Sequence, residues 1–171
     1  MNDKIVWITG ASSGIGEATA LRFAKEGWKV AVSARRVELL NKLAENENIY
    51  SYPLDITDTI KIKEVFESII KDLGKIDLCI FSSGTYERKS EKEISVENIK
   101  QVIDVNFLGV INSVSSVEKY FKENKSGHIA IVSSPVGYRG LPKSSGYTPS
   151  KAALNNFTQG IYFDFQKFNV R

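Results

Sequence analysis

The sequence predicts an α/β fold in which a doubly wound parallel sheet is covered by helices on both faces. Short apolar runs alternate with helical patterns along the chain, and each run has the length of one buried strand. A glycine-rich turn joins the first run to a helix-forming segment, which is a connection typical of such folds. The 171 residues suffice for one buried core, so we expect a single domain over residues 1–171.

The expected strands follow the apolar runs in order. They cover Ile5–Thr9, Lys29–Ala34, Ile49–Pro53, Leu78–Ser82 and His128–Ser133. Between the third and fourth strands, apolar residues recur at helical steps of three and four, namely at Ile62, Val65, Phe66, Ile69, Ile70 and Leu73. The last segment repeats the pattern at Leu154, Phe157, Ile161, Phe165 and Phe168. The sequence has no internal repeats or Pro-rich linkers that would indicate a second domain.

Composition argues against several classes of function. The net charge is only +3, and lysines alternate with glutamates instead of forming a basic stripe, so we expect no nucleic-acid partner. No apolar run approaches the roughly 20 residues of a membrane span, and the first residues do not resemble a secretory signal. We therefore expect no membrane association and a cytoplasmic location. One cysteine, Cys79, and one histidine, His128, cannot supply a disulfide or a zinc ligand set, so we expect no metal.

The most informative segment is the turn from Thr9 to Gly16, with the sequence TGASSGIG. Glycines let the backbone approach a ligand closely, and the N–H groups that open the following helix face an anion. The alternative is an ordinary mobile turn without a ligand. We expect a phosphate cradle formed by Gly10, Ser12, Ser13, Gly14, Ile15 and Gly16.

A second pattern lies far downstream. Tyr147 and Lys151 are one helical turn apart and therefore share a helix face, although an ordinary amphipathic helix start is the alternative interpretation. Ser133 and Ser134 end the preceding strand, and Ser134 lies thirteen residues before Tyr147. Together with the glycine turn, the serine and the YxxxK spacing resemble the short-chain dehydrogenase/reductase family over the whole of Lys4–Arg171.

The resemblance implies a Rossmann-like sheet with strand order 3-2-1-4-5, and hydride transfer between a nicotinamide cofactor and a small carbonyl or alcohol substrate. It implies the catalytic residues Asn106, Ser134, Tyr147 and Lys151. A phenol with an unperturbed pKa near 10 needs help to act as a base, and the Lys151 ammonium would favour the phenolate of Tyr147. Ser134 would donate a hydrogen bond to the substrate oxygen, Asn106 would hold a relay water, and Tyr147 and Lys151 would also contact the cofactor.

The end of the second strand bears on the choice of cofactor. NAD-binding members of such folds carry an acid about 20 residues after the glycine turn, whereas an arginine accommodates a 2′-phosphate. Here Ala34 takes the place of the acid, and Arg35 and Arg36 follow it. We therefore expect NADP(H) rather than NAD(H), with two ordinary surface arginines as the alternative.

Other expected cofactor contacts follow the third and fourth strands. Asp55, with Ile56, resembles the family aspartate that contacts the adenine, although Asp55 could instead cap the next helix. Thr57 or Asp58 could provide the cap. After the fourth strand, Ser83 and Gly84 are expected at the cofactor. The family motif N-N-A-G is replaced there by Phe81-Ser82-Ser83-Gly84, so we expect altered bracing of the sheet.

The resemblance also implies a domain that is incomplete at its C-terminal end. Family members continue into a sixth strand, a substrate-binding helical segment and a seventh strand, whereas this sequence stops at Asn169–Arg171. Two functions stay open: an NADP(H)-dependent oxidoreductase, and a nucleotide-binding or assembly module without turnover. The segment Pro135–Pro142 predicts a partly apolar pocket wall. An unpaired edge at His128–Ser133 predicts a homo-oligomer, either a dimer or a tetramer.

Overall fold

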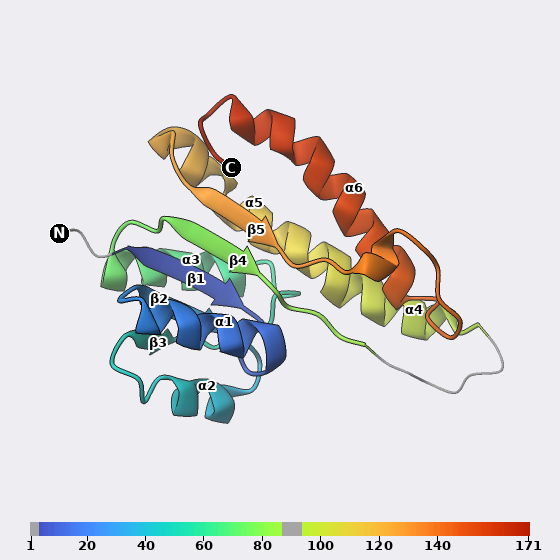
Figure 1. Cartoon of the computed structure of the whole chain (residues 1–171), viewed down its shortest axis with the longest axis horizontal. Helices are drawn as coiled ribbons and strands as arrows, with labels where there is room; N and C mark the ends of the chain where they lie inside the picture. Colours follow the sequence, from blue (N-terminus) through green and yellow to red (C-terminus); the bar gives the residue numbers. More distant parts are fainter. Residues whose placement is uncertain (1–3, 87–93) are drawn as a thin grey trace.

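A parallel five-stranded sheet with the order β3-β2-β1-β4-β5 forms the middle layer of the protein (Figure 1). The computed structural model describes residues 4–86 and 94–171. The strands are β1 Ile5–Thr9, β2 Lys29–Ser33, β3 Ile49–Ser51, β4 Leu78–Phe81 and β5 His128–Ile131. The fold class and the strand order predicted from the sequence are thus confirmed.

Four of the strands end one or two residues earlier than the sequence predicted. The expected third strand reached Pro53, but proline has no N–H to donate to a ladder. Single hydrogen bonds continue past the ends of other strands, such as Val132 N to Phe81 O at 2.9 Å. Beyond those bonds the chain leaves the sheet to form the loops at its carboxyl edge, where the candidate site lies.

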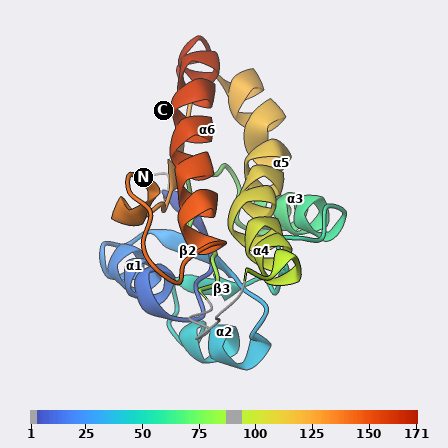
Figure 2. The ribbon, with the colours of Figure 1, turned by 90° about the vertical axis from the view of Figure 1, so that its right-hand side faces the viewer.

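Helices cover both faces of the sheet, and α1 and α3 lie on opposite sides of it (Figure 2). Their bounds are α1 Gly14–Lys25, α2 Val37–Leu43, α3 Lys61–Leu73, α4 Val96–Ile103, α5 Gly109–Asn124 and α6 Tyr147–Gln166. A π-helical segment, Asp104–Leu108, joins α4 to α5, and a short 3₁₀ helix, Pro135–Gly137, follows β5.

The alternation of side chains along β1 divides the core into two parts. Val6 and Ile8 pack with buried residues of α1 and α2, whereas Ile5 and Trp7 pack with α3, α5 and α6. Trp7 is fully buried, and its indole N–H donates to Ser33 Oγ at 3.0 Å, so the large ring is accommodated without an unpaired donor. Both faces of the sheet are therefore closed, as in a doubly wound fold.

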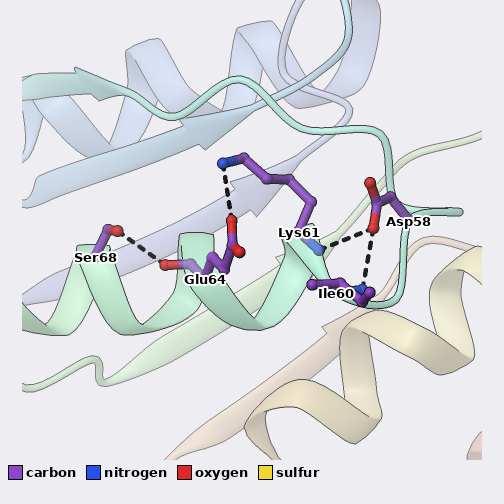
Figure 3. A network of polar contacts seen from close by, with 5 residues as sticks. All are labelled: Asp58, Ile60, Lys61, Glu64 and Ser68. Atoms are coloured by element: carbon purple, nitrogen blue, oxygen red, sulfur yellow. Dashed lines mark hydrogen bonds and ion pairs between the residues drawn. The ribbon is translucent and has the colours of Figure 1, made fainter.

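Hydrogen bonds at the start of α3 identify the residue that caps this helix. Asp58 Oδ1 accepts hydrogen bonds from the backbone N–H of Ile60 at 3.0 Å and of Lys61 at 2.9 Å (Figure 3). Farther along the helix, Lys61 pairs with Glu64, and Ser68 donates to the Glu64 carbonyl. Asp58 is thus the capping residue, which leaves Asp55 available for another role.

The last residues of the chain lie beside β5. Val170 forms a parallel bridge with Gly127, Arg171 N donates to Gly127 O at 3.1 Å, and Ile129 N donates to Arg171 O at 2.8 Å. The expectation of an unpaired edge at His128–Ser133 is therefore wrong at the amino end of β5, because the chain's own end pairs with it. Among the described residues, no helix is both long and apolar enough to cross a membrane, and the expected cytoplasmic location stays a prediction.

Candidate active site

The glycine turn has a backbone course that only glycine permits at its two tightest points. Gly10 has φ +70°, and a Cβ there would come within 2.7 Å of the Ser83 backbone. A Cβ on Gly16 would collide with the carbonyl of Gly10. Gly14 also has a positive φ, +61°, although a Cβ there would meet open space. The turn thus brings the N-terminus of α1 against the end of β4, and the first N–H groups of that helix lack intrahelical acceptors.

A hollow of about 310 Å³ opens at the carboxyl ends of β1, β2 and β4. Most of the cofactor-binding residues expected from the sequence line it: Gly10, Ser12, Ser13, Ile15, Gly16, Arg35, Arg36, Asp55, Ile56, Ser83 and Gly84. Gly14, Tyr147 and Lys151 do not. Four lining residues were missed, namely Ala34, Leu54, Ser82 and Val105. Each of the four directly precedes a residue that the sequence had singled out, namely Arg35, Asp55, Ser83 or Asn106, so adjacency was the signal that could have indicated them.

The two arginines after β2 differ in their contacts. Arg36 Nη2 donates to Ser12 Oγ at 2.9 Å and to Ser13 Oγ at 2.6 Å, and Arg36 Nε donates to Ser12 Oγ at 3.1 Å. These bonds tie the loop after β2 to the glycine turn across the hollow. Arg35 lines the same hollow and also a neighbouring one of about 310 Å³ beside α4. A cationic end of the hollow is thus present at the position expected for a 2′-phosphate.

Asp55 also lies on the wall of the hollow, where Thr57 fixes its carboxylate. Asp55 Oδ1 accepts from the Thr57 backbone N–H at 3.0 Å and from its hydroxyl at 2.8 Å. The second carboxylate oxygen is the group that could accept a hydrogen bond from a bound base. The capping alternative for Asp55 is excluded by the Asp58 cap described above.

Lys151 lies deep in the structure, at the first turns of α6. Its side chain is 4% exposed, and its Nζ donates to the Val132 carbonyl at 2.9 Å. The same Nζ lies 5.8 Å from the centroid of the Tyr147 ring. Burial lowers the pKa of Lys151, because desolvation penalises the ammonium form. The predicted proximity of Tyr147 and Lys151 on one helix face is present.

Asn106 is fully buried within the π-helical segment and uses both ends of its amide. Its Oδ1 accepts from Thr85 N at 2.6 Å, and its Nδ2 donates to Thr85 O at 2.9 Å and to Ser150 Oγ at 3.2 Å. Such single-turn π segments are frequent at functional sites. Asn106 therefore fastens the loop after β4 to the first turn of α6.

The two serines after β5 have different partners, which bears on the choice between them. Ser133 Oγ donates to the Lys151 carbonyl at 3.2 Å, whereas Ser134 Oγ accepts from Val136 N at 3.4 Å. The hydroxyl proton of Ser133 is thus already donated to a backbone carbonyl. The hydroxyl proton of Ser134 has no acceptor among the described residues, which leaves it for a ligand.

The segment Phe81–Gly84, which replaces N-N-A-G, makes its own contacts with the sheet and the loops, and the altered bracing stays a prediction. Phe81 is fully buried and packs edge-on against Trp7 at 5.8 Å between ring centroids. Ser82 Oγ donates to the Thr9 carbonyl at 2.6 Å, which joins the ends of β4 and β1. A Cβ on Gly84 would lie 3.4 Å from Asn106 Oδ1, so the loop passes directly beside the catalytic candidates.

A second hollow, of about 450 Å³, lies between the segment after the 3₁₀ helix and the first turns of α6. Val136, Leu141 and Pro149 contribute apolar walls, as expected for the segment Pro135–Pro142. Ser144 and Thr148 also line it, and neither of their buried hydroxyls has a partner among the described residues.

Comparison with known proteins identifies the family. A profile of the family described as short chain dehydrogenase matches residues 4–171. The chain belongs to the short-chain dehydrogenase family. Dehydrogenase/reductase SDR family member 7 from Homo sapiens is 35% identical over 170 residues, which are 94% of this chain and 50% of that protein. The 3-oxoacyl-(acyl-carrier-protein) reductase FabG from Thermotoga maritima is 36% identical over 176 residues, 100% of this chain and 72% of that protein.

Solved structures of other proteins share this fold. The structure of ElxO with NADP bound superposes with a TM-score of 0.93 at 28% identity, over 99% of this chain and 71% of that one. A short-chain dehydrogenase from Streptomyces avermitilis gives a TM-score of 0.92 at 25% identity, over 100% of this chain and 64% of that one. The chain thus spans between half and about three quarters of the length of these relatives.

The lowered pKa of Lys151 predicts how folding stability varies at alkaline pH. Between that lowered pKa and the ordinary value of 10.5, the unfolded chain binds this proton more tightly than the folded chain. The contribution of Lys151 to the free energy of unfolding therefore rises as the pH increases through this window. Below the window, that contribution stays at its lower value. Lys151→Met removes the ionisable group, so the variant is expected to lack this rise.

Urea unfolding of both proteins at a series of pH values measures the difference. Loss of the hydrogen bond to Val132 lowers the stability of Lys151→Met equally at every pH, so the pH dependence isolates the charge. Lys119→Met is the control, because the Lys119 side chain is 86% exposed. Parallel stability curves for Lys151→Met and the unsubstituted protein would contradict the prediction.

Proposed function

We propose that this member of the short-chain dehydrogenase family binds NADP(H) and transfers hydride between the nicotinamide and the carbonyl or hydroxyl carbon of a small substrate. One observation carries the proposal: the buried Lys151, the ring of Tyr147 and the amide of Asn106 gather beside a hollow that ends in a cationic cradle. NADP(H) needs both parts, because its adenosine 2′-phosphate lies at one end of the molecule, its pyrophosphate in the middle and its nicotinamide ring at the other end.

The residues at the hollow fit a nucleotide. Gly10 and Gly16 pack against neighbouring backbone and fix the course of the turn, whereas a Cβ on Gly14 would meet open space, so a pyrophosphate can approach the N-terminus of α1 there. Asp55 offers an acceptor for the adenine amino group, and Arg35 and Arg36 offer donors for a 2′-phosphate. The bound cofactor supplies or receives the hydride, and the protein supplies binding, orientation and proton transfer.

Tyr147 exchanges the proton in this proposal. As a carbonyl is reduced, its oxygen gains negative charge and takes a proton from the Tyr147 hydroxyl, and in the reverse direction the phenolate accepts the proton. Lys151 favours the phenolate by its charge, and it keeps donors beyond the one bonded to Val132. Ser134 donates to the same substrate oxygen, where a preoriented donor stabilises developing charge.

The contacts of Arg36 support NADP(H) over NAD(H). Ser12, Ser13 and Arg36 already meet, so a phosphate bonded to them would gain both hydroxyl and guanidinium donors without a large rearrangement. Ala34 leaves the position of the NAD-selecting acid without a charge. The relative ElxO has been solved with NADP bound, which agrees with this choice.

A module that binds the nucleotide without turnover is the second candidate. The observation that favours it is that the hollow is lined by most of the expected nucleotide contacts, whereas Tyr147 and Lys151 do not line it. NADPH oxidation measured over a panel of carbonyl compounds, beside a binding titration, separates the two candidates. Binding together with turnover supports the oxidoreductase, whereas binding without turnover for every carbonyl supports the module.

Tyr147→Phe tests the assigned chemistry. The variant is expected to lose most turnover, by about 10²- to 10⁴-fold in kcat, because a positioned acid or base contributes that factor. The dissociation constant for NADPH is expected to stay within about twofold, since the aromatic ring is kept. Lys151→Ala should instead impair both kcat and NADPH binding. Full activity in Tyr147→Phe would rule out its role in proton exchange.

Arg35→Asp tests the choice of cofactor. We expect the ratio of NADPH to NADH affinities to fall by roughly 10- to 150-fold, because a hydrogen bond to a charged group contributes about 1.5–3 kcal/mol. The introduced acid also repels the phosphate. Arg22→Asp is the matched control, because it makes the same charge change on an arginine of α1 whose side chain is 71% exposed.

Dissociation constants for both cofactors, measured by isothermal titration, give the result. If Arg35→Asp and Arg22→Asp leave the ratio equally unchanged, Arg35 does not contact the 2′-phosphate. The same measurement on Arg36→Ala then decides whether the phosphate is held by Arg36 with Ser12 and Ser13.

We also infer a homo-oligomer in solution. On α6, Tyr162 is 48% exposed and Phe163 is 66% exposed, and their rings contact each other. Adjacent exposed aromatic rings on a long helix favour association. Light scattering at several concentrations should give a mass above 19.1 kDa, and Phe163→Glu should lower it. A monomer of 19.1 kDa at every concentration would overturn the inference.

A further inference from the structure

A second tyrosine meets the ring of Tyr147. Tyr86 lies in the loop after β4, and its ring centroid is 4.8 Å from that of Tyr147, with an angle of 75° between the ring planes. This edge-to-face arrangement is a preferred geometry for aromatic pairs. The contact joins the loop after β4 to the start of α6, two segments that follow different strands of the sheet (Figure 1). The sequence offered no signal for it.

The position of Tyr86 is set by the residue before it. Asn106 binds both the N–H and the carbonyl of Thr85, which is the pattern that a neighbouring strand would provide. Because Asn106 is fully buried, this pairing is protected from competing water. Tyr86 is the next residue along the chain, so the clamp on Thr85 limits where its ring can lie.

Tyr147 thereby has two close partners from the described site. The Lys151 ammonium lies 5.8 Å from the centroid of its ring, and the Tyr86 ring packs against the same ring. Tyr147 is the first residue of α6, so no preceding turn of that helix restrains its χ1 angle. Tyr86 itself is 50% exposed, and burial of its own side chain does not explain its placement.

We propose that Tyr86 is a positioning residue for Tyr147: its aromatic ring holds the Tyr147 phenol in one rotamer, aimed at the oxygen of the bound substrate. The ring of Tyr86 is what matters, and its hydroxyl is not required. The consequence for catalysis rests on the proposed function, because a misaimed phenol slows proton exchange without weakening cofactor binding. The restraint on the rotamer does not rest on that function.

Nuclear magnetic resonance tests the restraint without any turnover. Three-bond couplings report the χ1 rotamers of isotope-labelled tyrosines, and Tyr147→Phe identifies the Tyr147 signals. We expect one dominant rotamer in the unsubstituted protein and in Tyr86→Phe, and averaged couplings in Tyr86→Leu. Tyr138→Leu is the control, since Tyr138 is 81% exposed on the segment after β5 and should leave the couplings unchanged. A single rotamer in Tyr86→Leu would overturn the proposal.

Kinetics then tests the consequence. In Tyr86→Leu, kcat for NADPH-dependent carbonyl reduction should fall roughly 2- to 13-fold, the rate equivalent of one aromatic pair, while the NADPH dissociation constant stays constant. Tyr86→Phe should restore kcat. A fall of equal size in Tyr86→Phe would show that the hydroxyl acts instead and would overturn the proposal. If no variant turns over, the proposed function fails, and the rotamer measurement alone decides the role of Tyr86.

Discussion

The close crossing of the glycine turn and the end of β4 is the constraint on which the rest of the site depends. A Cβ on Gly10 would meet the Ser83 backbone at 2.7 Å, and Ser82 Oγ bonds the Thr9 carbonyl at 2.6 Å. The carboxyl ends of β1 and β4 are therefore held together at the point where the segments that follow them would otherwise diverge. This contact fixes the floor of the hollow, because α1 begins directly after the turn and the β4 loop starts from the same point.

The course of the β4 loop follows from that crossing and connects the hollow with the reacting groups. Leaving Ser83, the loop passes Gly84, where a Cβ would lie 3.4 Å from Asn106 Oδ1 and 3.8 Å from Lys151 Nζ. Thr85 is then paired with Asn106 on both sides of its peptide unit. A buried amide that bonds the β4 loop to α6 leaves little freedom to the loop, because breaking the pairing would leave several buried polar groups unsatisfied. Hydrogen bonds from the side chains of Asn106 and Ser82 to backbone groups thus preorganise the described part of the site.

Sequence reasoning predicted the features that depend on local pattern. The strand starts, the strand order and the glycine turn follow from periodicity and from the family resemblance, and all are present in the structure. Contacts between distant segments were not predictable in the same way. The pairing of Arg36 with Ser12 and Ser13, the contact of Tyr86 with Tyr147 and the pairing of the chain's end with β5 all join residues far apart in sequence. The composition and spacing of those residues do not indicate which distant residue each of them contacts.

The buried lysine shows why these distant contacts matter to the proposed chemistry. Lys151 is 4% exposed, and its ammonium carries a desolvation penalty that the Val132 carbonyl offsets only in part, as the lowered pKa of Lys151 indicates. An anionic neighbour would offset more of it, and in the proposed function that neighbour is the phenolate of Tyr147, whose ring centroid lies 5.8 Å from Lys151 Nζ. The burial that costs folding stability would strengthen this proposed attraction, since charges interact more strongly in a low-dielectric surrounding. Because that attraction depends on where the phenol oxygen lies, the rotamer of Tyr147 and the groups that restrain it become part of the chemistry.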